Sequence, residues 1–169
     1  MGPTQLKDTE FHQFKRWLHQ TVGIHLSDAK KALVAGRLSK RLKHHNLDSY
    51  GEYFQLITSD DATAELQAAI DLLTTNETYF FREPKHFAFL RDRILRQIAP
   101  GQTFRVWSAA SSSGEEPYSI AMTIADVLTT MPWEVLASDI STHVLTIARA
   151  GHYPIARAQH IAQPQLAKY

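Results

Sequence analysis

The stretch RVWSAASSSGEEPYSIAM, at residues 105–122, decides the fold. Apolar and polar side chains alternate at its beginning, which predicts a β-strand over residues 103–109. The run SSSGEEP, at residues 111–117, then predicts a tight loop of small residues. Pro117 suits the first turn of a helix, and the two glutamates before it suit the positive end of the helix dipole. The apolar spacing that follows, from Tyr118 to about Leu128, predicts that helix.

A second strand and a second helix follow in the same order. The apolar run WEVLASD, at residues 133–139, predicts a strand, and Ser141 can cap a helix over residues 142–150 that Gly151 ends. Two strands joined through a helix predict a parallel βαβ unit, because parallel strands need a long crossover connection. The chain from residue 103 onward is therefore predicted to be an α/β domain.

The chain before residue 99 is predicted to be mostly helical. Apolar residues recur at helical spacing from Phe11 to Val22, and further helices are expected over residues 29–44, 50–58, 62–73 and 84–98. Three regions follow: a helical N-terminal domain over residues 1–83, a helix and linker over 84–102, and a partial α/β domain over 103–169. The predicted fold class is thus α/β, with a small all-helical domain followed by the start of a Rossmann-like domain.

Composition excludes several classes of protein. The 169 residues include 18 Lys or Arg, 17 Asp or Glu and no Cys, and 44% of them are hydrophobic. The hydrophobic fraction excludes wholesale disorder, and the lack of Cys excludes disulfides, thiolate zinc sites and cysteine nucleophiles. The histidines show no metal-ligand spacing, so we expect no metal. No apolar run is long enough to cross a bilayer, so we expect no membrane insertion. The lack of Cys fits a cytoplasmic or other reducing compartment.

Positive charge is concentrated at the start of the chain. Residues 1–58 carry nine Lys or Arg and five Asp or Glu, whereas the rest is mildly acidic. On the predicted helix over residues 29–44, the basic side chains gather on one side, within an arc of about 60° for Lys30, Arg37, Arg41 and His44, with Lys40 beside it. This face is either a solvated helix surface or a binding surface for an acidic partner. The net charge of +1 is low for a nucleic-acid-binding domain.

The loop of the βαβ unit is typical of a nucleotide-like ligand site. Small residues let a ligand approach the backbone, and Asp139, 25 residues after Gly114, can bind ribose hydroxyls. The loop lacks G-x-G-x-x-G, and Glu115 and Glu116 would repel a pyrophosphate. Carboxylates instead suit a ligand that joins cationic groups to an adenosine, such as S-adenosylmethionine. The alternative is that the two glutamates only stabilise a helix N-terminus.

Four segments together resemble one known family. They are GIHLSDAKKALVAGRLSKRL (23–42), LTTNETYFFRE (73–83), RVWSAASSSGEEPYSIAM (105–122) and VLASDISTHVLTIARAGHYP (135–154). The chain resembles the CheR family of chemotaxis receptor methyltransferases from about residue 8 to residue 169. The combination of N-x-T-x-F-F-R-E with a GEEPYS loop is highly specific.

The resemblance implies methylation of glutamate side chains on bacterial chemoreceptors, with S-adenosylmethionine as cofactor and S-adenosylhomocysteine as product. The cofactor-binding residues that it implies are Thr78, Arg82, Ala109, Gly114, Glu116 and Asp139. In the family, the residue at Glu116 contacts the methionyl ammonium and that at Asp139 the ribose, while Arg82 reaches the cofactor and is the catalytic candidate. The loop carries Ser111 where many members have Cys or Ala.

The resemblance also gives the basic helix a role. Receptor methylation helices are rich in glutamate, so Lys30, Arg37, Lys40, Arg41 and His44 are the candidate receptor-binding residues. A non-catalytic interaction module, which would bind an acidic partner through this helix beside an incomplete nucleotide site, is the alternative function.

The family's sequences continue past the point that matches QLAKY, residues 165–169. The resemblance therefore implies a truncated methyltransferase domain that lacks the later strands of its sheet. We expect a chain of this extent to be inactive by itself. We also expect it to complete its sheet with a second copy, as a homodimer or by strand exchange, because parallel strands with open edges favour pairing.

Overall fold

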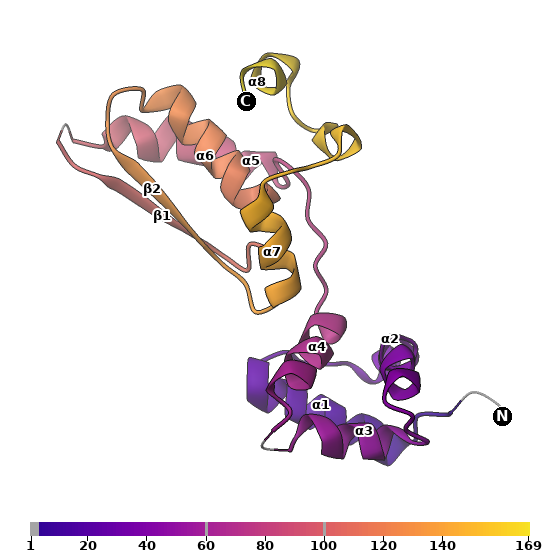
Figure 1. Cartoon of the computed structure of the whole chain (residues 1–169). Coiled ribbons are helices and arrows are strands. Elements are labelled where there is room, and N and C mark those ends of the chain that lie inside the picture. Colours follow the sequence, from indigo (N-terminus) through magenta and orange to yellow (C-terminus); the bar gives the residue numbers. More distant parts are fainter. Residues whose placement is uncertain (1–3, 60, 100) are drawn as a thin grey trace. The chain divides into compact units, whose positions relative to one another are not determined.

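The computed structural model describes residues 4–59, 61–99 and 101–169. The chain divides into two compact units, Met1–Thr75 and Asn76–Tyr169 (Figure 1). This division falls before the position that the sequence suggests, residue 83, because the segment after Thr75 packs with the second unit. Phe81, for example, contacts the apolar core of that unit. Among the described residues, no helix is both long enough and apolar enough to span a membrane.

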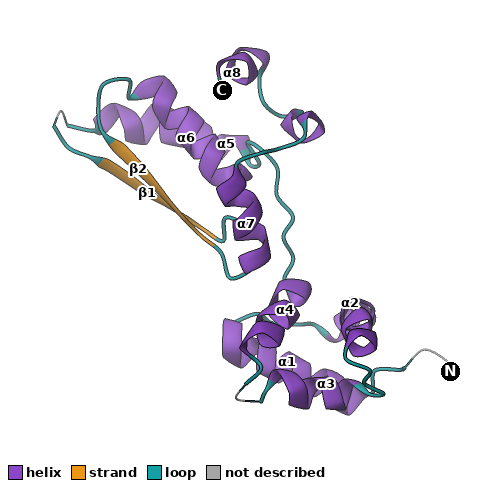
Figure 2. Ribbon diagram, in the orientation of Figure 1, coloured by secondary structure: helices purple, strands orange, loops and turns teal. Residues whose placement is uncertain are grey.

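The described residues of the first unit form a bundle of four α-helices (Figure 2). They are α1 (Asp8–Val22), α2 (Lys31–His44), α3 (Tyr50–Ile57) and α4 (Thr63–Leu73). Apolar faces of all four meet in one core, whose members include the fully buried Phe14, Leu38 and Tyr53. The sequence predicts α2 from Ala29, but Asp28–Lys30 form a 3₁₀ turn first and the α-helix begins at Lys31.

Side chains secure the ends of these helices. Glu10, which is buried, accepts hydrogen bonds from the backbone N–H of Lys7 at 2.8 Å and of Gly51 at 2.8 Å, and so joins the start of α1 to α3. Ser49 caps α3 by accepting from the N–H of Glu52. Gly23 ends α1 in the left-handed conformation that glycine adopts without strain. Capping contacts therefore fix the ends of these helices, and Glu10 also joins α1 to α3.

The second unit is built on the predicted βαβ unit. The strands β1 (Phe104–Ala109) and β2 (Trp133–Ser138) are parallel, and α6 (Glu115–Val127) connects them. Helix α7 (Thr142–Ala150) follows β2, with Ser141 as its N-cap and Gly151 as its C-cap, as predicted. Helix α6 begins at Glu115, three residues before the predicted start, because Gly114 takes the left-handed N-cap position.

The remaining helices of the second unit lie before and after the βαβ unit in the sequence. The predicted single helix over residues 84–98 is instead α5 (Pro84–Phe89), a π-helical turn (Leu90–Ile94) and a 3₁₀ turn (Leu95–Gln97). Leu90 and Leu95 both pack in the core although they are five residues apart, a spacing that a π turn places on one side. A 3₁₀ turn (Ile155–Ala158) and α8 (Gln163–Lys168) end the chain.

The two faces of the sheet differ. One face, with Val106 and Val135, packs with Ile120 and Ile124 of α6. The other face exposes Trp107 and its register partner Leu136, each with 64% of its surface accessible. The faces of parallel sheets are usually covered. This face is therefore an exposed apolar surface.

Candidate functional site

Two segments of the second unit hold residues in strained backbone conformations. In the loop after β1, Ala110 (φ 60°) and Ser112 (φ 49°) are left-handed, and Gly114 (φ 101°) has a positive φ that glycine adopts without strain. In the segment that precedes α5, Phe81 (φ 57°) and Glu83 (φ 56°) are left-handed too. Such conformations persist only where surrounding contacts impose them, and they concentrate at functional sites.

Asp139, at the end of β2, fixes the loop after β1. Its Oδ2 accepts a hydrogen bond from the backbone N–H of Ser112 at 2.7 Å, and its Oδ1 accepts from the N–H of Ser141 at 2.9 Å. The hydroxyl of Ser112 in turn donates to the carbonyl of Asn76 at 3.1 Å. Asp139 therefore links the loop, the start of α7 and the strained segment before α5 at the carboxyl edge of the sheet. In α/β folds this edge is where ligands bind.

The two adjacent glutamates at the start of α6 point in different directions. Glu116 is exposed, and its Oε1 accepts from the Ser108 hydroxyl at 2.7 Å. Glu115 is fully buried and accepts from the Ser113 hydroxyl at 2.7 Å. Both lie at the positive end of the α6 dipole, which favours their negative charge. Only Glu116 is available to a ligand from solvent.

The segment before α5 is tied to α6. The backbone N–H of Phe81 donates to the Ser119 hydroxyl at 3.0 Å, which itself donates to the carbonyl of Glu115 at 2.6 Å. Arg82 is exposed, and its Nη1 donates to the carbonyl of Glu77 at 2.8 Å. Within the described ranges Arg82 forms no ion pair, so Nε and Nη2 of its guanidinium can still donate to a ligand.

The polar groups at this edge of the sheet fit a nucleoside that carries a cation. Each Asp139 oxygen accepts one backbone hydrogen bond and keeps a second lone pair for a hydroxyl donor. The Glu116 carboxylate is exposed for an ammonium. The Ser111 hydroxyl is buried and has no hydrogen-bond partner among the described residues, which is unusual for a buried polar atom. The two carboxylates accept hydrogen bonds and carry negative charge, and therefore do not suit a pyrophosphate.

Comparison with known proteins agrees with this chemistry. A family model described as "CheR methyltransferase, SAM binding domain" matches residues 76–169, and one described as "CheR methyltransferase, all-alpha domain" matches residues 9–74. The chain belongs to the CheR methyltransferase family. Its second unit is the family's S-adenosylmethionine-binding domain, and its first unit is the all-alpha domain.

Individual relatives are named as chemotaxis methyltransferases. A "Chemotaxis protein methyltransferase" of Escherichia coli K12 is 45% identical over 166 residues, which cover 97% of this chain and 57% of the relative. "Chemotaxis protein methyltransferase 2" of Pseudomonas aeruginosa is 43% identical over 157 residues, with 92% and 55% covered. A relative from Borreliella burgdorferi is 36% identical over 170 residues, with 95% and 60% covered. The chain thus spans little more than half the length of these relatives.

The structure of this CheR-family chain brings several of the sequence-predicted cofactor residues to one edge. Ala109, Gly114 and Glu116 belong to the β1–α6 connection, and Asp139 hydrogen-bonds into it. Thr78 and Arg82 lie on the strained segment that Ser112 and Ser119 hold. Sequence reasoning did not single out three residues that make these contacts, Asn76, Ser108 and Ser112. Asn76 opens the N-x-T motif, and this is the one signal that could have indicated it.

The candidate receptor-binding residues fall into two groups. Lys30, Lys40 and His44 are exposed. Arg37 is partly buried, and its Nη1 donates to the carbonyls of Leu73 at 3.2 Å and Thr74 at 2.9 Å, where it caps the end of α4. Arg37 therefore has a structural partner within its own unit.

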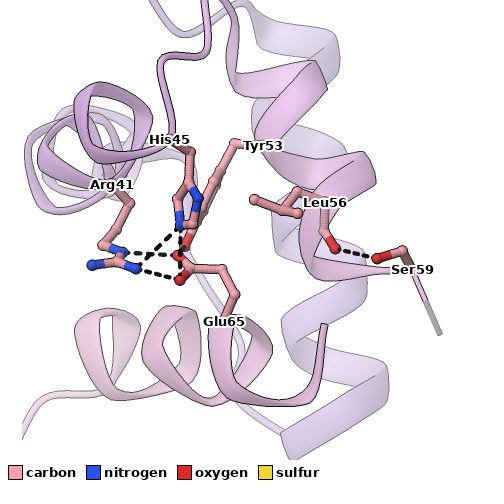
Figure 3. Close-up of polar contacts among 6 residues, drawn as sticks. All are labelled: Arg41, His45, Tyr53, Leu56, Ser59 and Glu65. Carbon is pink, nitrogen blue, oxygen red and sulfur yellow. Dashed lines mark hydrogen bonds and ion pairs between the residues drawn. The ribbon is translucent and has the colours of Figure 1, made fainter. Parts of the chain in front are cut away.

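Arg41 also binds within the unit (Figure 3). It forms an ion pair with Glu65 of α4, and its Nε donates to Oε1 at 2.8 Å. The Tyr53 hydroxyl donates to the same oxygen at 2.7 Å, and Nε2 of His45 lies 3.0 Å from Oε2. We name these four residues the Glu65 cluster. It connects α2, α3 and α4.

Ionisation in the Glu65 cluster follows from its contacts. Burial opposes the charge on Glu65, but the hydrogen bonds from Arg41, Tyr53 and His45 outweigh it and lower the carboxyl pKa from 4.5 to about 2. Burial, followed by the hydrogen bond to Glu65, raises the pKa of Tyr53 far above its ordinary value. At neutral pH the cluster therefore holds an ionised Glu65 and a neutral tyrosine.

Proposed function

We propose that this chain is the receptor-recognition and cofactor-binding part of an S-adenosylmethionine-dependent protein-glutamate O-methyltransferase that acts on bacterial chemoreceptors. The observation that carries the proposal is the Asp139 carboxylate at the end of β2, hydrogen-bonded to a strained loop beside the exposed Glu116. The names of the relatives support a chemotaxis role. A location in the cytoplasm, where such receptors expose their signalling helices, belongs to the same proposal.

The residues suggest how the reaction is assisted. The cofactor supplies a methyl group on a positively charged sulfonium. A substrate glutamate is already ionised at neutral pH, since its ordinary pKa is about 4.3, and needs no general base. Asp139 would hold the ribose, and Glu116 the ammonium. Arg82, with Nε and Nη2 free among the described residues, would orient the substrate carboxylate as a planar, two-pronged donor. Catalysis would then rest on positioning.

Recognition of the receptor is assigned to the exposed basic side chains of α2. Lys30, Lys40 and His44 are accessible and would attract a glutamate-rich helix. Arg37 adds positive charge to this surface while it holds α4, whereas the charge of Arg41 is paired with Glu65. Charge complementarity of this kind mainly raises the rate of association.

Titration calorimetry with S-adenosylhomocysteine tests the cofactor site. The wild-type chain is expected to bind it, and Asp139→Ala is expected to bind more weakly. Glu134→Ala, an exposed acid of the same strand paired with Arg105, is the matched control and should bind as the wild type does. No binding by the wild type, together with binding of an acidic receptor peptide, would favour the alternative of a non-catalytic interaction module.

The exposed sheet face suggests self-association. We propose that a second copy of this chain completes the sheet through edge pairing or strand exchange, and that it also packs over Trp107 and Leu136, which are both largely exposed. Light scattering is expected to give a dimer whose population falls in the Leu136→Lys variant. A monomer at high protein concentration would contradict this part of the proposal.

A further inference from the structure

The segment after α7 also contacts the strained loop and the start of α6. The Tyr153 hydroxyl donates to the carbonyl of Ser113 at 2.7 Å. Nη2 of Arg157 lies 2.8 Å from Oε1 of Glu115, the first residue of α6. One short segment therefore contacts the loop through Tyr153 and the first residue of α6 through Arg157.

Glu115 needs such a partner because it carries a charge in the interior. Its side chain is 0% exposed, and its Oε2 accepts from the Ser113 hydroxyl at 2.7 Å. No hydrogen bond of good geometry reaches Oε1 among the described residues, so the guanidinium of Arg157 is the compensating group there. Removal of one partner of a buried ion pair leaves an uncompensated charge, which strongly destabilises the surrounding structure.

Ser113 is consequently held at two points. Its carbonyl accepts from Tyr153, and its hydroxyl donates to Glu115. Its neighbours on both sides, Ser112 and Gly114, have φ values of 49° and 101°. A serine reaches a left-handed conformation only when its surroundings impose it, and these two contacts lie directly beside it.

The tyrosine itself is firmly placed. Its ring packs edge-on against Phe80, with ring centroids 5.0 Å apart, and against Tyr118 at 5.8 Å. A Cβ on Gly114 would lie 2.5 Å from the Tyr153 hydroxyl oxygen, so that oxygen sits directly against the backbone of the loop. Burial raises the pKa of Tyr153, and its hydroxyl therefore keeps the proton that it donates.

We propose that Tyr153 and Arg157 are positioning residues, which impose the loop conformation that presents the N–H of Ser112 to Asp139. The inference rests on the proposed function in one respect, that this loop binds the cofactor. Neither side chain touches the cofactor in the proposal. Each acts through the loop, Tyr153 at a carbonyl and Arg157 at the buried Glu115.

Hydrogen exchange at single amides, followed by NMR, tests the inference without a ligand. The reporters are the N–H groups of Ser111, Ser112 and Gly114, which donate to Ser138, Asp139 and Ser111 respectively. Tyr153→Phe keeps the ring and removes one hydrogen bond, so exchange at these amides should rise by about tenfold. Arg157→Ala should raise it further, and Arg157→Lys should restore most of the protection. Arg149→Ala, which removes an exposed arginine of α7, is the matched control.

The pattern of exchange decides the outcome. Faster exchange confined to the loop supports a positioning role. Unchanged loop exchange in Tyr153→Phe, or equal acceleration throughout β1, α6 and the loop, overturns it, because the second result describes a general stabiliser. If Arg157→Ala does not fold, loop exchange in Tyr153→Phe and Arg157→Lys still shows whether the two side chains position the loop.

Cofactor affinity provides a second readout. Tyr153→Phe should weaken S-adenosylhomocysteine binding by about three- to tenfold, in line with loss of one hydrogen bond that shapes the loop. If the wild-type chain does not bind this ligand, the proposed function fails, and the exchange experiment still decides whether Tyr153 and Arg157 position the loop.

Discussion

Replacement of Glu65 by Gln should destabilise the helical unit in a pH-dependent way. The glutamine keeps the shape and can still accept hydrogen bonds, but it removes the charge that pairs with Arg41. The pKa of Glu65 falls from 4.5 to about 2 on folding. Each pKa unit corresponds to about 1.4 kcal/mol, so the ionised form is stabilised by at most about 3.5 kcal/mol. Because Glu65, Arg41 and His45 keep 12%, 27% and 29% exposure, solvent screening reduces this to about 2 kcal/mol.

The pH dependence has a definite direction. Glu65 has a lower pKa in the folded state, so its stabilisation is fully present above pH 4.5 and is lost as the pH falls through about 2. Roughly half of it is gone by pH 3. The wild type and Glu65→Gln should therefore differ most at pH 7 and converge in acid, since protonated Glu resembles Gln.

Urea unfolding followed by tryptophan fluorescence measures this difference. Trp17 reports the helical unit once Trp107 and Trp133 of the other unit are replaced by Phe. Asp28→Asn is the control, because this exposed acid pairs with Lys15 at the surface and should change stability far less. An unchanged unfolding free energy of Glu65→Gln at pH 7, or a difference that stays constant down to pH 3, would refute the reasoning.

Four further changes have expected outcomes. Asp139→Ala should weaken cofactor binding by about 1–3 kcal/mol, the range for loss of a charged hydrogen-bond partner, as measured by calorimetry. Lys30→Glu with Lys40→Glu should lower the rate of receptor methylation in a chain of family length, with unchanged cofactor affinity and a smaller effect in high salt. Gly114→Ala should destabilise the second unit by more than 2 kcal/mol, since its Cβ meets other atoms at 2.5 Å and 2.9 Å, whereas Gly36→Ala should stabilise α2 by about 1 kcal/mol.

Each of these predictions has a result that would contradict it. Unchanged calorimetric affinity would remove the ribose role of Asp139. Receptor methylation at the normal rate in low salt would show that the exposed lysines do not contact the receptor. Equal thermal stability of Gly114→Ala and the wild type would mean that the loop can relax away from Tyr153.

The course of the chain through the βαβ unit is predictable from local signals. The alternation of β1, the Ser141 cap and the Gly151 stop all act within a few residues, and the structure confirms them. The start of α6 is less predictable, because Pro117 is acceptable at several positions of a first turn and only the conformation of Gly114 sets the boundary.

The roles of neighbouring charged residues are not predictable from spacing. Glu115 and Glu116 are adjacent, and only packing with Arg157 shows which carboxylate is interior. Arg37 and Arg41 lie on the basic side of α2, as the helical repeat predicts, but their long side chains reach α4. Such contacts join residues 24 or more positions apart, beyond the range of any local pattern.

The central claim is that the loop after β1 and the end of β2 form one cofactor site. Titration of the ¹⁵N-labelled chain with S-adenosylhomocysteine, followed by NMR, tests it most directly. Saturable shifts are expected at the amides of Ser111, Ser112 and Gly114 and around Asp139, with the helical unit little changed. The absence of shifts at millimolar ligand, or shifts confined to other parts of the chain, would contradict it.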